Sequence, residues 1–257
     1  MVIVDNVTKT FRVSRRQKRE MGGDFTGSTL DAVREVSFTC QPGRVFALLG
    51  PNGAGKTTAL RLIATMLKPT SGRIEVGGYD VERQAREVRS QIGFLTGSTG
   101  LYDRLTANEM VKYYADLHHV DRQTFIRRRD ELFTTLDMSD FAGRRIGKLS
   151  SGMRQKVSIV RTMIHDPEVL VFDEPTAGLD VVASRNIIDL IRDCRNRGRT
   201  VLFSTHRMGE VSQLSDDLAI IHRGRLCYNG TYEAFQSQME RPSLEDEFIR
   251  VLEEAEE

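Results

Sequence analysis

The sequence lacks a large net charge. Its 37 Lys and Arg residues nearly balance its 36 Asp and Glu residues, which leaves a formal net charge of +1 over 257 residues. This balance argues against a protein that binds nucleic acid through bulk positive charge. The hydrophobic fraction of 39% and the charged fraction of 28% are those of an ordinary globular protein.

The sequence also lacks a long apolar segment and a cysteine pattern. Its longest stretch without Asp, Glu, Lys or Arg covers residues 90–102 and contains glycines, whereas a membrane-spanning helix needs about 20 mostly apolar residues. The N-terminal segment reaches an acidic residue at Asp5 and has no apolar core typical of a signal peptide. The cysteines, Cys40, Cys194 and Cys227, are widely spaced, which favours unpaired thiols in a reducing cytosol.

Short β-rich segments alternate with helical segments, which is typical of a mainly parallel sheet covered by helices. We expect strands over residues 2–7, 33–40, 44–49, 73–76, 169–172, 200–204 and 218–222, and helices over residues 57–67 and 182–197. The charged run at 15–19 (RRQKR) and the glycines after it predict a surface loop between residues 12 and 29.

Residues from about 96 to 146 are charged and helix-rich, which predicts an inserted helical subdomain. We therefore divide the chain into a first core part (1–95), a helical subdomain (96–157), a second core part (158–230) and an acidic tail (231–257).

The tail contains a predicted amphipathic helix. Ser243 is a suitable N-cap, with Asp246 at the third helical position. Four apolar side chains fall on one helix face: Leu244, Phe248, Val251 and Leu252. This face either packs on its own domain or docks on a partner.

The strongest motif is GPNGAGKTT at residues 50–58, which fits the pattern GxxxxGK[ST] directly after a predicted buried strand and at the start of a predicted helix. In this context the backbone N–H groups of the loop surround phosphate oxygens, and the helix N-terminus adds positive potential. Lys56 would reach the β- and γ-phosphates, and the Thr57 hydroxyl would bind Mg²⁺. The predicted nucleotide-binding residues are Gly50, Pro51, Asn52, Gly53, Ala54, Gly55, Lys56, Thr57 and Thr58.

A second motif, EVLVFDE at residues 168–174, places two acids after four apolar residues. Acids at the carboxyl end of a strand lie where α/β sheets bind ligands. Asp173 is suited to hold Mg²⁺, directly or through water. Glu174 is suited to activate a water molecule as a general base.

At this point the chain resembles the nucleotide-binding subunit of ABC transporters. Residues 149–153 (LSSGM) resemble that family's LSGGQ signature, and residues 173–180 (DEPTAGLD) resemble its Walker B element and D-loop. Thr205 and His206 resemble the switch-histidine segment, and residues 9–11 (KTF) resemble the segment with the adenine-stacking aromatic residue. The resemblance implies a RecA-type P-loop NTPase core with a mainly parallel sheet, an antiparallel β part and an inserted helical subdomain.

The resemblance also implies roles for individual residues. His206 would contact the γ-phosphate and Phe11 would stack on adenine. Two subunits of this family pair head to tail, and each signature closes over the partner's ATP. The residues acting in trans would be Ser150, Ser151, Gly152 and Asp180. The residues alone also allow Ser150 as a plain N-cap, His206 as a structural histidine and Phe11 as a core residue.

One position departs from the family pattern. Members usually carry Gln after a strand of the type I-G-[YF]-x-P-Q, and Gly97 stands at that place here. A glycine has no side chain to bind metal, so coupling would use Ser98, Thr99, a backbone carbonyl or water. Our hypothesis is that this changes coupling to the partner without abolishing hydrolysis; an unchanged coupling and Mg²⁺ dependence in Gly97→Gln would contradict it.

The implied protein is an ATPase that uses ATP and Mg²⁺, pairs with a second copy and drives an integral membrane permease from the cytoplasmic face of the cell membrane, without nucleic acid. The segments GFLTG, LYDRLTANE and SSGMRQK resemble bacterial exporters of the sodium-extruding type and their multidrug relatives, so sodium is the first expected cargo. A soluble ABC-type ATPase acting on ribosomes or DNA is the alternative, although only one phosphate loop and no coiled-coil insertion are visible. A non-hydrolysing regulatory cassette is disfavoured because Lys56, Asp173, Glu174 and His206 are all present.

Overall fold

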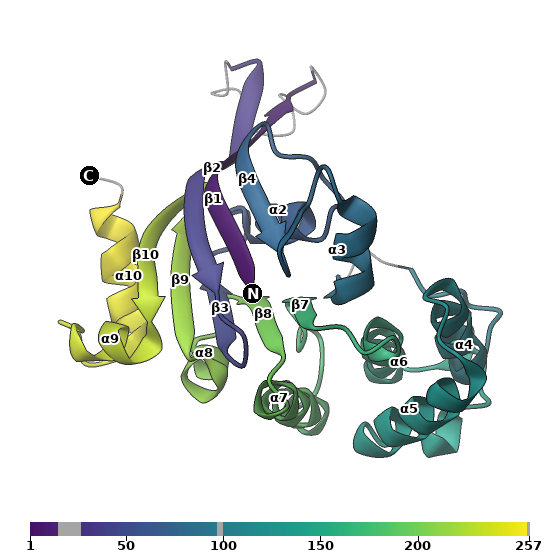
Figure 1. Ribbon diagram of the computed structural model, residues 1–257. Helices are drawn as coiled ribbons and strands as arrows, with labels where there is room; N and C mark the ends of the chain where they lie inside the picture. Colours follow the sequence, from purple (N-terminus) through teal and green to yellow (C-terminus); the bar gives the residue numbers. More distant parts are fainter. Residues whose placement is uncertain (15–26, 97–99, 256–257) are drawn as a thin grey trace.

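The computed structural model describes residues 1–14, 27–96 and 100–255 (Figure 1). Its strands are β1 (Val2–Arg12), β2 (Thr29–Cys40), β3 (Val45–Leu49), β4 (Ser71–Val76), β5 (Tyr79–Asp80), β6 (Ile92–Leu95), β7 (Val169–Asp173), β8 (Thr200–Thr205), β9 (Asp217–His222) and β10 (Arg225–Thr231). Its helices are α2 (Lys56–Ile63), α3 (Ala85–Gln91), α4 (Ala107–Leu117), α5 (Arg122–Thr135), α6 (Ser151–Met163), α7 (Val181–Asn196), α8 (Met208–Leu214), α9 (Tyr232–Ser237) and α10 (Leu244–Glu254). Short 3₁₀ turns cover Ser139–Phe141 and Ile146–Lys148.

The larger sheet has the strand order β10–β9–β3–β8–β7–β6. Strands β9, β3, β8, β7 and β6 run parallel, and β10 is an antiparallel edge strand. Every residue of β3 is buried, as expected for a parallel strand covered on both faces. The carboxyl ends of β3, β7 and β8 therefore meet at one edge of the sheet, where the candidate site lies.

The smaller sheet is antiparallel, with the order β2–β1–β4–β5. It covers one face of the larger sheet together with α2 (Figure 1). Val2 and Val4 of β1 belong to the same buried cluster as Phe46 and Leu48 of β3. This apolar layer holds the two sheets together, since buried apolar area is the main stabilising contribution to folding.

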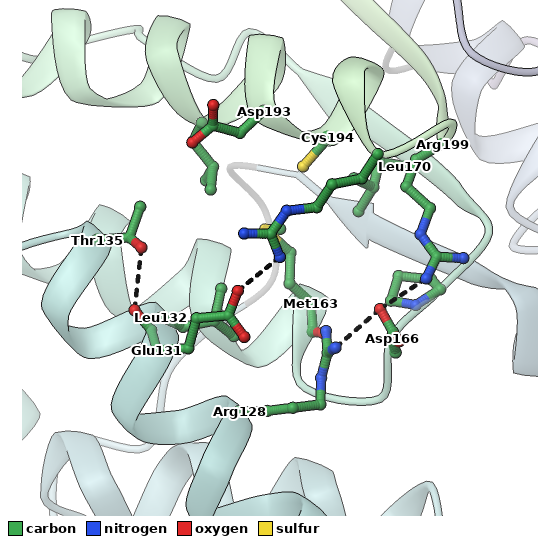
Figure 2. Close-up of a pocket in the computed structure, with 13 residues that line it drawn as sticks. Arg128, Glu131, Leu132, Thr135, Met163, Asp166, Leu170, Asp193, Cys194 and Arg199 are labelled. Atoms are coloured by element: carbon green, nitrogen blue, oxygen red, sulfur yellow. Dashed lines mark hydrogen bonds and ion pairs between the residues drawn. The ribbon is translucent and has the colours of Figure 1, made fainter.

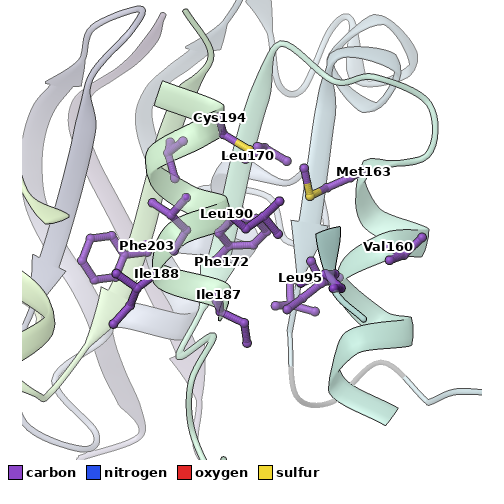
Figure 3. Packing of buried hydrophobic residues seen from close by; sticks show 14 of the residues in the cluster. Leu95, Val160, Met163, Leu170, Phe172, Ile187, Ile188, Leu190, Cys194 and Phe203 are labelled. Carbon is purple, nitrogen blue, oxygen red and sulfur yellow. The ribbon is translucent and has the colours of Figure 1, made fainter. Parts of the chain in front are cut away.

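The opposite face of the larger sheet packs against α6 and α7 (Figure 3). Phe172 of β7 and Phe203 of β8 contribute to this core, with Ile187 and Leu190 of α7 and Val160 of α6. The apolar residues of α7 recur at three- and four-residue spacing, which gives one continuous buried stripe.

The segment between β6 and α6 is helical, as the sequence predicted. Thr106 and Glu109 form a capping box at the start of α4, and Asp121 caps α5. Helices α4 and α5 lie beside α6, away from the sheets (Figure 1). The division of the chain at residues 95, 157 and 230 stays a prediction; residue 157 falls inside α6 and residue 230 inside β10.

An ion-pair cluster ties α5 to the core (Figure 2). Asp166 accepts from Arg128 of α5 at 2.8 Å and from Arg199, next to β8, at 3.0 Å. The same Arg128 donates to the carbonyl oxygens of Met163 at 2.8 Å and Ile164 at 3.0 Å. Arg128 therefore serves as a cap for the carboxyl end of α6, because the last carbonyls of a helix have no partner within it. The hollow beside this cluster measures only about 40 Å³.

Some predicted boundaries were wrong. The helix after the phosphate loop ends at Ile63 and not near Leu67, because Thr65 takes a left-handed conformation with φ of 60°. The backbone N–H groups of Met66 and Leu67 then turn back to the carbonyl of Arg61. Strands β1 and β2 extend further than predicted, to Arg12 and from Thr29.

The C-terminal helix forms as predicted. The Ser243 side chain caps α10 by accepting from the backbone N–H of Asp246 at 3.1 Å. The predicted apolar face packs on the chain's own core: Leu244, Phe248, Val251 and Leu252. Strand β10 and helix α9, which precede it, were not predicted. None of the helices in the described part of the chain is long and apolar enough to cross a bilayer.

Candidate active site

The phosphate-loop motif lies where the sequence predicted it, between the end of β3 and the start of α2. A Cβ atom at Gly50 would lie 2.3 Å from the carbonyl oxygen of Ile221. One at Gly55, where φ is 110°, would lie 2.3 Å from the carbonyl oxygen of Ala32. Glycine is required at both positions because no other residue fits this tight turn. The loop runs directly into the N-terminus of α2. Backbone N–H groups at the start of a helix form a favourable site for an anion.

Lys56 lies within the loop, and only 5% of it is exposed. Its Nζ donates to the carbonyl oxygens of Gly50 at 2.7 Å and Pro51 at 2.9 Å. Burial lowers the pKa of Lys56, and the nearby carboxylates of Glu174 and Asp173 oppose this effect. The Nζ to Glu174 Oε1 distance is 3.9 Å. The ammonium group is therefore held at the mouth of the loop, facing the acids of β7.

Thr57 and Asp173 meet across the site. The Thr57 hydroxyl donates to Asp173 Oδ1 at 3.0 Å. The buried Ser204 hydroxyl also donates to Asp173 Oδ1, at 2.7 Å, and accepts from the backbone N–H of Glu174 at 3.1 Å. Hydroxyl and carboxylate oxygens are the ligands that Mg²⁺ prefers, so this pair fits the ion. Among the described residues there is no group of three His, Cys, Asp or Glu suited to a metal.

Glu174 and His206 form a pair at the neighbouring strand ends. His206 Nδ1 lies 3.1 Å from Glu174 Oε1, and the histidine side chain is 46% exposed. Because an ionised carboxylate can only accept, Nδ1 carries the proton of this hydrogen bond. Glu174 has a φ of 48°, an unusual backbone conformation that often occurs at functional sites. His206 is thus hydrogen-bonded and partly exposed, and its contact with the γ-phosphate stays a prediction.

Thr57, Asp173 and Glu174 border a cleft of about 410 Å³, whereas Lys56 and His206 are not among the residues that line it. Its lining residues are Thr57, Arg61, Thr96, Gln155, Asp173, Glu174 and Ala177. The sequence analysis missed Arg61, Thr96 and Gln155. Gln155 follows Ser151 by one helical turn on α6, and its Nε2 donates to the carbonyl oxygen of Pro175 at 2.8 Å. Helix α6 therefore touches the cleft with its first turns.

The residues expected to act in trans do not line this cleft. Ser150 caps α6 by accepting from the backbone N–H of Met153 at 3.3 Å, while Ser151 is exposed at its first position. Asp180 caps α7 by accepting from the backbone N–H of Ala183 at 2.8 Å and is also exposed. The N-cap role predicted for Ser150 is therefore confirmed.

Phe11 lies near the end of β1, opposite Leu30 of β2. It is 37% exposed, and the Nζ of Lys9 lies 5.2 Å from the centre of its ring. A core role for Phe11 is therefore wrong. Stacking on adenine stays a prediction. The predictions for Gly97, Ser98 and Thr99, and for the basic run at 15–19, lie outside the described residues.

A glycine-rich loop between a buried parallel strand and a helix, facing an Asp-Glu pair at the carboxyl end of another strand of the same sheet, defines a P-loop nucleoside triphosphatase. The family model for ABC transporters matches residues 33–177. The ABC transporter ATP-binding protein NatA of Bacillus subtilis is 43% identical to this chain. The match covers 86% of this chain and 90% of NatA. The daunorubicin resistance ATP-binding protein DrrA3 of Streptomyces coeruleorubidus is 37% identical over 76% of this chain, which spans 62% of that relative.

A solved structure described as a dimeric, post-hydrolysis state of the ATP-binding cassette MJ0796 bound to ADP and Pi superposes with a TM-score of 0.77. It is 25% identical and covers 90% of this chain and 98% of its own. The chain belongs to the ABC transporter family, as an ATP-binding and ATP-hydrolysing subunit. The predicted fold class is confirmed.

Proposed function

We propose that two copies of the chain enclose two Mg·ATP, hydrolyse them and thereby drive export by a separate membrane permease. The observation that carries this proposal is the separation of the two halves of the site. Lys56, Thr57 and Asp173 converge at one edge of the sheet, with Glu174 beside them. The exposed Ser150 and Ser151 of the signature, at the start of α6, do not line that cleft. A second copy would bring its signature to it.

The phosphate loop binds the triphosphate of ATP. Its N–H groups and the N-terminus of α2 face the phosphate oxygens, and Lys56 places a positive charge on the β- and γ-phosphates. Thr57 and Asp173 hold Mg²⁺, which when bound offsets phosphate charge. Without nucleotide, Lys56 Nζ donates to the carbonyl oxygens of Gly50 and Pro51. In this proposal it exchanges these contacts for the phosphate oxygens when ATP binds.

Glu174 orients the attacking water and takes its proton. The water oxygen forms a bond to the γ-phosphorus while the bond to the bridging β-phosphate oxygen breaks, and ADP leaves. His206 donates to Glu174, and in this proposal it also contacts the γ-phosphate. Catalysis then consists mainly of positioning and charge stabilisation.

The second copy completes each site. Ser150, Ser151 and Gly152 offer hydroxyl groups and backbone N–H groups at the N-terminus of α6, an anion site for the partner's γ-phosphate. Asp180 also acts on the partner's site in this proposal. Phe11 stacks on the adenine of the ATP bound by its own chain. A homodimer is the simplest assembly, because one chain carries one of each half-site.

The permease is a separate chain in this proposal, and the subunit binds it at the cytoplasmic face of the membrane. The name of one relative, a daunorubicin resistance ATP-binding protein, supports export of a drug. We propose sodium ions or a drug as cargo. The cargo site would lie on the permease.

Co-purification tests this proposal. We expect a tagged chain in its native cell to appear in the membrane fraction and, after detergent extraction, to carry a multi-span membrane protein in a stoichiometric amount. The tagged Lys56→Ala variant is the matched control, because docking on a permease does not need the phosphate loop. Recovery of the chain only with ribosomes, DNA or the soluble fraction would contradict a transport role and favour the alternative ATPase.

A further inference from the structure

Glu210 of α8 is a buried carboxylate close to the candidate site, and none of the roles above uses it. Only 7% of the residue is exposed. Its Oε1 accepts from the hydroxyl of Thr176, and its Oε2 accepts from the hydroxyl of Thr205 at 2.7 Å. The guanidinium group of Arg207 lies 3.3 Å from Oε1. Both threonines are buried as well.

The two threonines belong to the two segments that carry the proposed catalytic side chains. Thr176 follows Glu174 by two positions, after β7, and Thr205 directly precedes His206 at the end of β8. Each oxygen of the Glu210 carboxylate therefore holds one of the two segments. Ser204 provides a similar tie on the strands themselves, through Asp173 and the backbone N–H of Glu174.

A carboxylate is an unfavourable group to bury unless it is paired and hydrogen-bonded. Here two hydroxyls and one guanidinium group satisfy it, whereas an apolar side chain would fill the same place without that cost. The gain is geometric: a carboxylate fixes both hydroxyls at hydrogen-bond distance. Misplacing a catalytic group by about 1 Å can lower a rate 10²-fold. A bridge that fixes the segments carrying Glu174 and His206 would therefore preserve the rate of hydrolysis.

We propose that Glu210 is a positioning residue for ATP hydrolysis, bridging Thr176 and Thr205 so that Glu174 and His206 stay in contact. This inference rests on the proposed roles of Glu174 and His206. Glu210 is not itself catalytic, because its carboxylate is buried and both of its oxygens accept from threonine hydroxyls. Its removal therefore lowers the rate of the chemical step and leaves the phosphate loop intact.

The test compares steady-state kinetics of Glu210→Met and the wild type, per folded molecule. Methionine keeps the length of the side chain and removes the hydrogen bonds to both threonines together with the contact to Arg207. We expect kcat to fall about tenfold, with KM for ATP and the Kd of Mg·ATP changed less than twofold.

A matched control is available in α10. Glu247 is also buried and lies far along the chain from the site. Its carboxylate accepts from the backbone N–H groups of Glu240 and Arg241 and from the Arg250 guanidinium group. Glu247→Met is expected to lower the Tm without changing kcat of the folded protein. A Glu210→Met variant that behaves like this control would overturn the inference.

A second pair of variants covers the case in which Glu210→Met does not fold. Thr176→Ser keeps the hydroxyl and should retain the wild-type kcat, whereas Thr176→Val should lose about tenfold. Equal rates in these two variants would contradict the bridge. Wild-type hydrolysis by Glu174→Gln would remove the proposed function itself; an inactive Glu174→Gln beside a fully active Glu210→Met or Thr176→Val would remove the bridge alone.

Discussion

Replacing Glu174 by glutamine is expected to leave Mg·ATP binding intact and to lower ATP hydrolysis by about 10²–10⁴-fold. Glutamine has the size of glutamate and can still accept from His206 Nδ1, which lies 3.1 Å from Oε1. It cannot take a proton from water. Phosphate release measures the rate, and the quenching of a fluorescent ATP analogue measures the affinity.

Glu168→Gln is the matched control for this experiment. Glu168 lies directly before the same strand, β7, but its exposed carboxylate pairs with Arg199 at 2.5 Å, at the opposite end from the site. Its replacement should leave the rate of hydrolysis unchanged. Hydrolysis at the wild-type rate by Glu174→Gln would mean that another group takes the proton.

Replacing Lys56 by alanine is expected to weaken nucleotide binding strongly. A hydrogen bond to a charged group contributes about 1.5–3 kcal/mol, so the Kd of Mg·ATP should rise roughly 10- to 150-fold. The fold should persist, because the Lys56 Nζ contacts only loop carbonyls and the edge of the Glu174 carboxylate. Calorimetric titration with Mg·ATP measures the change.

The exposed Lys112 of α4, which pairs with Asp116, supplies the control for Lys56→Ala. Lys112→Ala removes the same charge from the surface and should leave the Kd unchanged. An unaltered Kd in Lys56→Ala would contradict phosphate binding by this loop. A rise in Kd together with a lower Tm would indicate that the loop itself had collapsed, so the Tm of both variants belongs to the measurement.

The parts of the site that the sequence predicted are those whose chemistry is local. The phosphate loop is one continuous segment, and the Asp-Glu pair directly follows an apolar strand; each pattern is recognised without knowledge of the fold. The approach of Thr57 to Asp173 then follows, because parallel strands bring their carboxyl ends to one edge.

The parts that it could not predict depend on contacts between distant segments. Ser204 and Glu210 lie on β8 and α8 and act on residues of the β7 segment, about 30 positions earlier in the chain. A serine at the end of a strand and a glutamate in a short helix have no distinctive pattern in the sequence. Phe11 shows the same limit, since its exposure depends on how β1 pairs with β2.

Secondary structure differed from prediction where a backbone conformation overrode residue preference. Thr65 ends α2 with a left-handed φ of 60°, although a β-branched residue rarely adopts it. Strand β10 was missed because it contains polar residues and a glycine, and pairing with β9 forms it. Tertiary contacts of this kind regularly outweigh local propensity.

The central claim is that a second copy of the chain completes each ATP site. The most direct test is the mass of the Glu174→Gln variant in sedimentation velocity experiments, with and without Mg·ATP. We predict one chain without nucleotide and two chains with it. Adding Ser151→Asp should keep the protein as one chain even when ATP is bound. Aspartate suits the exposed first position of α6, yet it places a negative charge against the partner's γ-phosphate. A single chain at saturating Mg·ATP in Glu174→Gln, or two chains in the double variant, would contradict a site completed by a second copy.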